Sequence, residues 1–107
     1  MILNNSNKEL ESAIVDALKE IFDPEIPVDI VELGLIYEVK ISDTNNVKVI
    51  MTLTAPNCPV AESLPVDVKN KVESVDGVGE AHVEVTFEPP WDKSMMSELA
   101  KLELGML

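Results

Sequence analysis

The sequence has few cysteines and few aromatic residues. It contains one cysteine in 107 residues, so no disulfide can form within the chain. A lone thiol agrees with a reducing compartment. Aromatic residues make up 4% of the chain and hydrophobic residues 46%, so the core must be mostly aliphatic. Chains of about 100 residues with this composition normally fold as one domain without disulfides or bound metals.

Targeting and standard enzyme signatures are also missing. No apolar run approaches the roughly 18–20 residues of a membrane span. The N-terminal sequence MILNNSNKEL lacks the basic region and the apolar core of a signal peptide. There is no phosphate-binding loop, GxGxxG, CxxC or HExxH motif. We therefore expect a cytoplasmic protein that is not a standard enzyme.

Basic residues are scarce. Twenty acidic against eight basic residues give a formal net charge of −12. Such a surface repels the phosphates of nucleic acids and anionic lipids, so we expect neither nucleic acid nor membrane as a partner. The acidity either keeps the protein soluble or forms a docking face for basic partners, and charge alone does not decide between the two.

Apolar periodicity predicts the first helix and the loop after it. Apolar residues recur at helical spacing from Leu10 to Ile21. Ser6 and Glu9 form a candidate capping box at the N-terminal end. Asp23-Pro24 is expected to end the helix near Phe22, because proline disfavours the helical conformation of the residue before it. Residues 23–37 then read as an ordered loop.

The rest of the chain alternates between strand and helix patterns. Residues 35–42 and 47–54 alternate as strands, and the turn-forming residues 43–46 between them predict a hairpin. Residues 59–75 are helical, and either this helix begins near Ser63 or Pro65 kinks it. Further along, the pattern predicts a third strand at 81–88 and then a last helix, capped by Asp92 or Ser94 and carrying Met95, Leu99 and Leu102.

The predicted order is helix, strand, strand, helix, strand, helix. This order predicts an α+β fold, a small two-layer sandwich in which helices cover a three-stranded sheet. The helix between the second and third strands can serve as a crossover, which would make those strands parallel and the sheet mixed. We expect residues 1–107 to form a single domain with a core of about 8–105.

The position of Cys58 suggests chemistry. It follows a strand in a proline-flanked loop, at or just before the start of a helix. Backbone N–H groups at a helix N-terminus stabilise a thiolate, whereas the nearby Glu62 acts in the opposite direction. From the residues alone, a reactive thiol and a buried filler both remain open.

Two other groups and the single histidine are weaker candidates. Four carboxylates crowd one loop: Asp23, Glu25, Asp29 and Glu32. Either Asp23 caps or turns the backbone and the other three are solvated, or Asp23 and Glu25 supply oxygen ligands or a base. If Asp23 and Glu25 face the same site as Cys58, their oxygens suit zinc or iron. Pro89-Pro90-Trp91 is either a rigid turn with a packed indole or an anchor for a partner. His82 should point away from the core of its strand into solvent.

Three blocks of the sequence resemble the SufT/PaaD-like iron–sulfur assembly family, whose eukaryotic relatives include targeting subunits of the cytosolic assembly machinery. The blocks are DPEIPVDIVELGLIY at 23–37, MTLTAPNCP at 51–59 and VTFEPPWDKSMMSELAKLELG at 85–105. The resemblance implies a role in maturing or delivering iron–sulfur clusters, with Cys58 as the reactive cysteine. The other site residues it implies are Asp23, Pro24, Glu25 and Pro27, together with the corner at Pro89, Pro90 and Trp91. The flanking Thr54, Asn57, Pro59 and Glu62 complete the candidate site.

The resemblance and the cysteine count limit the mechanism. An iron–sulfur cluster normally takes four thiolates, and one chain supplies one. We therefore expect no tightly bound cofactor, and Cys58 as a transient ligand of iron or of a cluster. A homodimer, small thiols or a partner's cysteines would complete the site. The expected partners are iron–sulfur assembly proteins and client apoproteins.

Other functions are kept as alternatives. One is an acidic interaction module in which Cys58 is merely packed. Another is a PaaD-type maturation factor for a phenylacetyl-CoA oxygenase, although the cysteine-rich tail of those proteins is absent from this sequence. A thiol-dependent hydrolase or reductase would need His82 beside Cys58. The Ile26-Pro27 bond can be cis or trans in either case.

Overall fold

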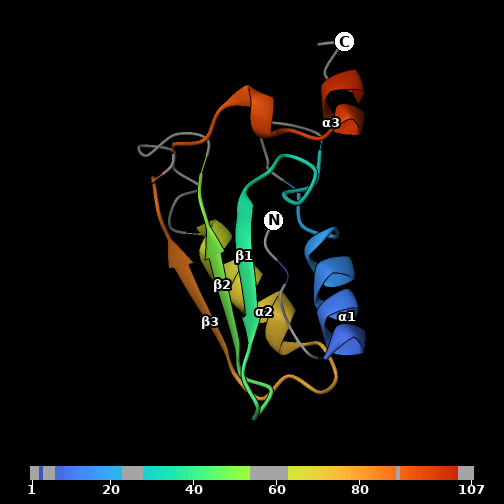
Figure 1. Cartoon of the computed structure of the whole chain (residues 1–107), viewed down its shortest axis with the longest axis vertical. Coiled ribbons are helices and arrows are strands. Elements are labelled where there is room, and N and C mark those ends of the chain that lie inside the picture. Colours follow the sequence, from blue (N-terminus) through green and yellow to red (C-terminus); the bar gives the residue numbers. More distant parts are fainter. Residues whose placement is uncertain (1–2, 4–6, 23–27, 54–62, 89, 104–107) are drawn as a thin grey trace.

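Three strands form one mixed sheet, and helices pack against it (Figure 1). The computed structural model describes residues 3, 7–22, 28–53, 63–88 and 90–103. In chain order the elements are α1 (Lys8–Leu18), β1 (Ile36–Ile41), β2 (Val47–Met51), α2 (Ser63–Glu73), β3 (Ala81–Val85), the short 3-10 helix η2 (Lys93–Met95) and α3 (Glu98–Glu103). The predicted α+β class and element order are confirmed, and η2 is an addition.

The sheet has the order β1-β2-β3 and both kinds of pairing. β1 and β2 are antiparallel, with Val39 opposite Val49. β2 and β3 are parallel, with Met51 opposite Val85, and α2 forms the crossover between them. The predicted hairpin and the predicted mixed sheet are therefore both confirmed.

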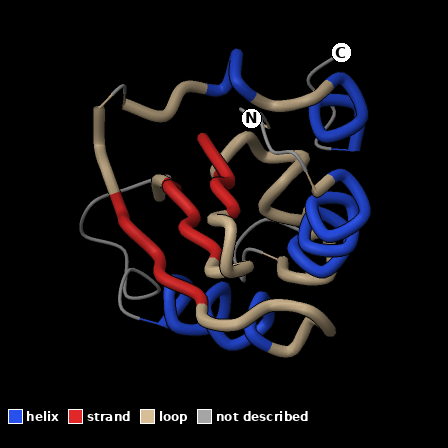
Figure 2. Tube along the Cα trace, turned by 60° about the horizontal axis from the view of Figure 1, so that its bottom comes forward, coloured by secondary structure: helices blue, strands red, loops and turns tan. Residues whose placement is uncertain are grey.

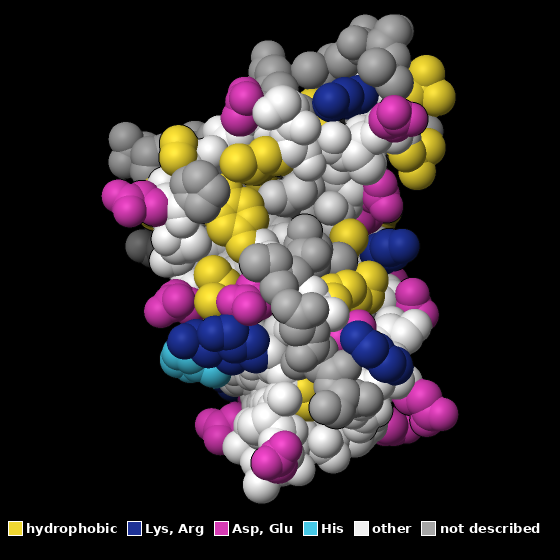
Figure 3. Space-filling model, viewed as in Figure 1, with side chains coloured by type: hydrophobic (Ala, Val, Ile, Leu, Met, Phe, Trp, Pro, Cys, Tyr) yellow, Lys and Arg dark blue, Asp and Glu magenta, His cyan; other side chains and the backbone are white. Residues whose placement is uncertain are grey.

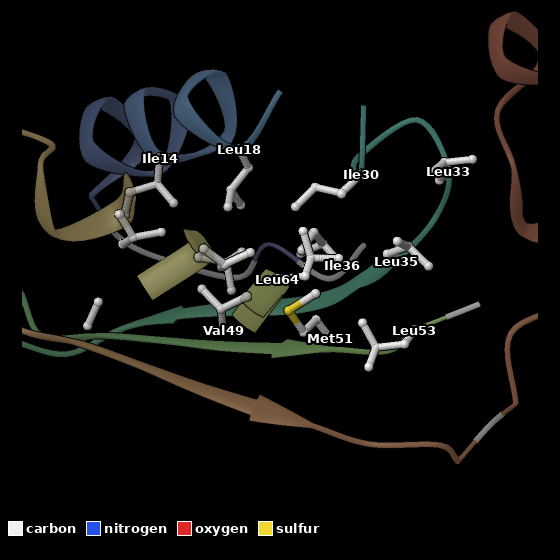
Figure 4. Packing of buried hydrophobic residues seen from close by; sticks show 14 of the residues in the cluster. Ile14, Leu18, Ile30, Leu33, Leu35, Ile36, Val49, Met51, Leu53 and Leu64 are labelled. Atoms are coloured by element: carbon white, nitrogen blue, oxygen red, sulfur yellow. The ribbon is translucent and has the colours of Figure 1, made fainter. Parts of the chain in front are cut away.

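The core lies between the sheet and helices α1 and α2 (Figure 4). Figure 2 shows α2 running along one side of the three strands. Among the described residues, the largest fully buried side chains are apolar apart from one threonine: Ile14, Leu18, Ile30, Leu33, Leu35, Met51, Val39, Val49, Val68, Val72 and Thr52. Within the described residues, no helix is long and apolar enough to cross a membrane.

The first helix differs from its prediction at both ends. Its N-cap is Asn7, whose Oδ1 accepts a hydrogen bond from the Leu10 N–H at 3.1 Å, so the predicted Ser6 cap is wrong. α1 ends at Leu18, and the chain leaves through a tight turn in which the Ile21 N–H donates to the Leu18 carbonyl. The periodic pattern continued to Ile21 because that residue still packs against the core.

The second helix begins at Ser63, which answers the question posed by Pro65. Pro65 therefore lies in the first turn of α2. Backbone N–H groups in that turn have no intrahelical acceptor, so proline removes no hydrogen bond there.

The last helix is shorter than expected and capped elsewhere. Ser97, rather than Asp92 or Ser94, is the N-cap, because its Oγ accepts from the Ala100 N–H at 3.1 Å. Met95 lies in η2 and not in this helix. α3 turns Ala100 into the core and leaves Leu99 and Leu102 exposed.

Candidate functional site

Most of the predicted site residues lie outside the described part of the chain. These residues are Asp23, Pro24, Glu25, Pro27, Thr54, Asn57, Cys58, Pro59, Glu62 and Pro89. The Ile26-Pro27 bond lies there too, so its isomer stays open. Pro90 and Trp91 are described, as are the chain ends that flank each of the other segments. The surroundings of the site can therefore be built from those flanking residues.

The flanking residues meet at one end of the sheet. The Thr52 N–H, just past β2, donates to the Leu35 carbonyl at 2.8 Å, at the end of the first block. On the other side of β2, the Thr86 N–H donates to the Met51 carbonyl at 2.8 Å, at the start of the third block. β2, the strand that leads toward Cys58, therefore lies between the first and the third block. A site built from all three blocks requires this arrangement.

Asp29 organises the first block locally. Its Oδ1 accepts from the N–H groups of Val31 and Glu32, at 3.1 and 3.0 Å. The chain is also held by an isolated bridge between Phe22 and Asp29, on either side of residues 23–27. The Asp29 carboxylate therefore forms a local turn, a role that was predicted for Asp23 and not for Asp29.

Trp91 ties the third block to the first. Its Nε1–H donates to the Leu33 carbonyl at 2.8 Å, and the indole is partly buried against the core. The Ser97 N–H donates to the Glu32 carbonyl at 2.8 Å. The indole is thus packed, as one of the two interpretations expected, whereas an anchoring role for the corner stays a prediction.

Glycine allows the two blocks to approach closely. Gly34 has a φ of +80°, and a Cβ built on it would collide with the carbonyl oxygen of Met95. Beside it, the Tyr37 hydroxyl donates to the Met95 Sδ at 3.6 Å. This glycine is therefore needed both for its backbone conformation and for the contact with the C-terminal arm, residues 86–97.

Thr52 was missed by the sequence analysis. Its side chain is fully buried, and among the described residues its Oγ1 has no hydrogen-bond partner. Buried hydroxyls normally find a partner, so this one is an anomaly two residues before the segment that contains Cys58. The sequence offered one signal of this burial. Thr52 lies between Met51 and Leu53, where both faces of the strand become apolar.

The described residues contain no group of three or more His, Cys, Asp or Glu able to hold a metal ion. His82 is exposed, as predicted, and pairs with Lys48 near the start of β2 and β3. Leu53 lies five residues further along, roughly 16 Å at the usual rise of a strand. The described geometry therefore lends no support to a thiol hydrolase or reductase that uses His82.

Comparison with known proteins agrees with the resemblance in the sequence. A family model described as "Iron-sulfur cluster assembly protein" matches residues 11–85. The "Fe-S protein maturation auxiliary factor" of Porphyromonas gingivalis is 52% identical over 105 residues, which are 98% of this chain and 100% of that protein. The "Fe-S protein maturation auxiliary factor SufT" of Staphylococcus aureus is 38% identical over 86 residues, covering 80% of this chain and 98% of that protein.

A solved structure shares the fold over nearly its whole length. It is a domain of unknown function, DUF59, from Bacillus anthracis, with a TM-score of 0.87 and 40% sequence identity. The match covers 95% of this chain and 97% of that one. On the family match, the full-length relatives and the shared fold, the chain belongs to the iron–sulfur cluster assembly protein family.

Proposed function

We propose that this protein is an accessory factor in iron–sulfur cluster maturation. The observation that carries the proposal is the 52% identity with a maturation auxiliary factor over 98% of this chain. The hydrogen bonds that bring all three resemblance blocks to one end of the sheet support it. Its partners are iron–sulfur assembly proteins and client apoproteins.

Cys58 is the proposed working group of this factor. Its thiolate would ligate iron or a cluster transiently while the cargo passes to a client. One cysteine per chain cannot supply the four thiolates of a cluster, so another molecule must complete the ligand set. That molecule is a second copy, a small thiol or the client itself.

Gene deletion tests the biological role. We expect lower activities of several iron–sulfur enzymes in the deletion strain, with unchanged amounts of their polypeptides, most visibly under iron limitation. Wild-type protein should restore the activities, and the Cys58→Ser variant should not. Normal activities across the panel, under stress as well, would refute the maturation role, whereas full rescue by Cys58→Ser would refute only the role of the thiol.

Anaerobic reconstitution with iron and sulfide tests direct binding. We expect at most a labile chromophore with less than one cluster per chain, and its loss in Cys58→Ser. A stable four-thiolate spectrum from the monomer would contradict the proposed transient ligation. Analytical ultracentrifugation of the same samples shows whether binding requires a dimer.

Thiol labelling separates a reactive from a packed cysteine. A soluble maleimide-type probe should label the native protein rapidly near neutral pH, at a rate that depends on pH. Labelling that requires denaturation would indicate a packed thiol and favour the acidic interaction module.

A further inference from the structure

The face of the sheet opposite α2 has an ordered charge pattern. Paired residues share a face, and the side chains alternating with the buried Val47, Val49 and Met51 point to this other side. In the described part of the chain no helix packs on it. Figure 3 shows lysine and histidine side chains gathered over the strands there, beside acidic ones.

One row of this face is basic. Lys40 of β1 lies opposite Lys48 of β2, which lies opposite His82 of β3. These three residues, here called the basic row, include two of the eight lysines and the one histidine of a chain that has no arginine. Lys40 and Lys48 carry like charges directly opposite each other, and such a pair destabilises a sheet, so it is unfavourable for the isolated protein.

Partners within the protein neutralise the basic row only in part. Lys40 Nζ lies 3.6 Å from Glu38 Oε1, in an exposed pair. Among the described residues, no ion pair or hydrogen bond joins the Lys48 ammonium or the His82 ring to another side chain. By contrast, Lys69 and Lys71 on α2 each have a carboxylate partner.

The row of paired residues next to the basic row limits which ligands can bind this face. It consists of Glu38, Ile50 and Glu84, which face each other across the three strands. A polyanion such as nucleic acid would meet these two carboxylates and the net charge of −12. A suitable ligand carries a few carboxylates for the basic row and an apolar side chain for Ile50.

The spacing of the basic row favours a helical ligand. Neighbouring strands lie about 4.8 Å apart, so the three side chains repeat at that interval. Residues four apart on a helix are separated by about 5–6 Å, whereas same-face residues of an extended strand are separated by about 6.7 Å. We propose that this face of the sheet binds an acidic helix of a partner protein, with its carboxylates on Lys40, Lys48 and His82. This inference does not depend on Cys58.

A synthetic helical peptide provides the probe. It carries glutamates at i, i+4 and i+8 with a leucine beside them, and its binding to the intact protein is followed by fluorescence anisotropy at 0.15 M salt. A second peptide has the same composition but distributes its glutamates around the helix. We expect the patterned peptide to bind at least about fivefold more tightly, since two to three surface ion pairs distinguish the two.

Matched variants locate the binding face. Lys48→Gln should weaken binding roughly twofold, and Glu84→Gln should leave it unchanged or tighten it. Lys19→Gln is the control, because Lys19 is exposed after α1 and its loss changes the net charge equally. Circular dichroism and urea midpoints confirm that each variant folds.

Several results would overturn the inference. Absence of binding up to millimolar peptide would do so, as would equal binding of both peptides or equal weakening by Lys19→Gln and Lys48→Gln. A dimer in ultracentrifugation that dissociates in Lys48→Gln would assign the face to a second copy instead. Complete competition by millimolar tripolyphosphate, with both peptides displaced alike, would indicate an anion site without preference for a helix.

Discussion

Thr52 is a buried residue whose hydroxyl finds no hydrogen-bond partner in the part of the chain that the structure describes. Valine has nearly the same shape and lacks the polar atom. We predict that Thr52→Val raises the free energy of unfolding by about 1 kcal/mol, because no hydrogen bond is lost and a buried polar group is removed. Urea denaturation followed by circular dichroism measures the difference.

Thr86→Val is the matched control for this change. The Thr86 hydroxyl donates to the Glu88 carbonyl and accepts from the Glu88 N–H, so its removal should be neutral or destabilising. A loss of 1 kcal/mol or more in Thr52→Val would contradict the prediction. It would mean that the native protein satisfies this hydroxyl, and the segment containing Cys58 would be the place to search.

Gly34 lies where the first block meets the C-terminal arm. We predict that Gly34→Ala lowers the free energy of unfolding by about 3 kcal/mol, since a positive φ is unfavourable for alanine and the new Cβ would strike the Met95 carbonyl. The urea midpoint reports the loss. Because the expected effect is on folding, the test needs no measurement of biological activity.

Gly77→Ala separates the cost of a positive φ from the cost of the collision with the Met95 carbonyl. Gly77 also has a positive φ, of +99°, but its Cβ would meet Leu10 Cδ1 at an ordinary 3.5 Å. Its cost should be that of backbone strain alone, about 1–2 kcal/mol. If both variants lose the same stability, the close approach to Met95 has no energetic consequence, and the prediction is wrong.

Among the elements, α2 and β3 are linked by the Glu73 carboxylate. A hydrogen bond from Lys69 Nζ at 2.9 Å is the larger cause that lowers the pKa of Glu73, and the Ala81 N–H at 3.3 Å adds to it against a smaller effect of burial. The pKa is therefore lower in the folded than in the unfolded state. The ionised group stabilises the fold above the unfolded pKa, and this contribution disappears as the pH falls through the folded value.

Because the pKa of Glu73 is lower in the folded state, the effect of Glu73→Gln on stability should depend on pH. The variant should be less stable than wild type at pH 7, and the difference should shrink as the pH falls below the ordinary carboxyl value of 4.5. Urea midpoints across the acid range measure it. Glu80→Gln, an exposed neighbour before β3, is the control. A difference that stays constant over the range would show that titration of Glu73 does not contribute.

Some of the helices and strands could be predicted from the sequence, and others were misplaced. The alternation of Val47, Val49 and Met51 and the turn at 43–46 were enough to predict the hairpin, because they are local signals. The crossover followed from the length of the chain between the second and third strands, which is enough to connect parallel neighbours. The N-terminal ends of α1 and α3 were misplaced because competing caps lay within a few residues: Asn7 next to Ser6, and Ser97 three residues after Ser94.

Local sequence patterns predicted less of the candidate site than of the fold. The Trp91 indole bonds to the Leu33 carbonyl, 58 residues away in sequence, and no local pattern encodes that partner. The burial of Thr52 likewise depends on how β2 is enclosed by its neighbours. Cys58 could be singled out because its residue type and position suggest chemistry, and its role remains a proposal.

At the scale of the whole molecule, the net charge of −12 acts against the compact state. The ion pairs between described residues all involve partly exposed side chains and contribute little: Lys8–Glu11, Lys40–Glu38, Lys69–Glu73 and Lys71–Glu20. Repulsion among carboxylates should therefore outweigh attraction. Salt, which screens both, should stabilise this protein.

We predict that the urea midpoint rises when NaCl increases from 0.01 to 0.1 M. Over this range the Debye length falls from about 30 Å, comparable with the 41 × 26 × 23 Å molecule, to about 10 Å. Asp16→Asn combined with Glu80→Gln removes two exposed charges, so this double variant should respond less steeply to salt. A midpoint that falls with salt would mean that the ion pairs outweigh the repulsion.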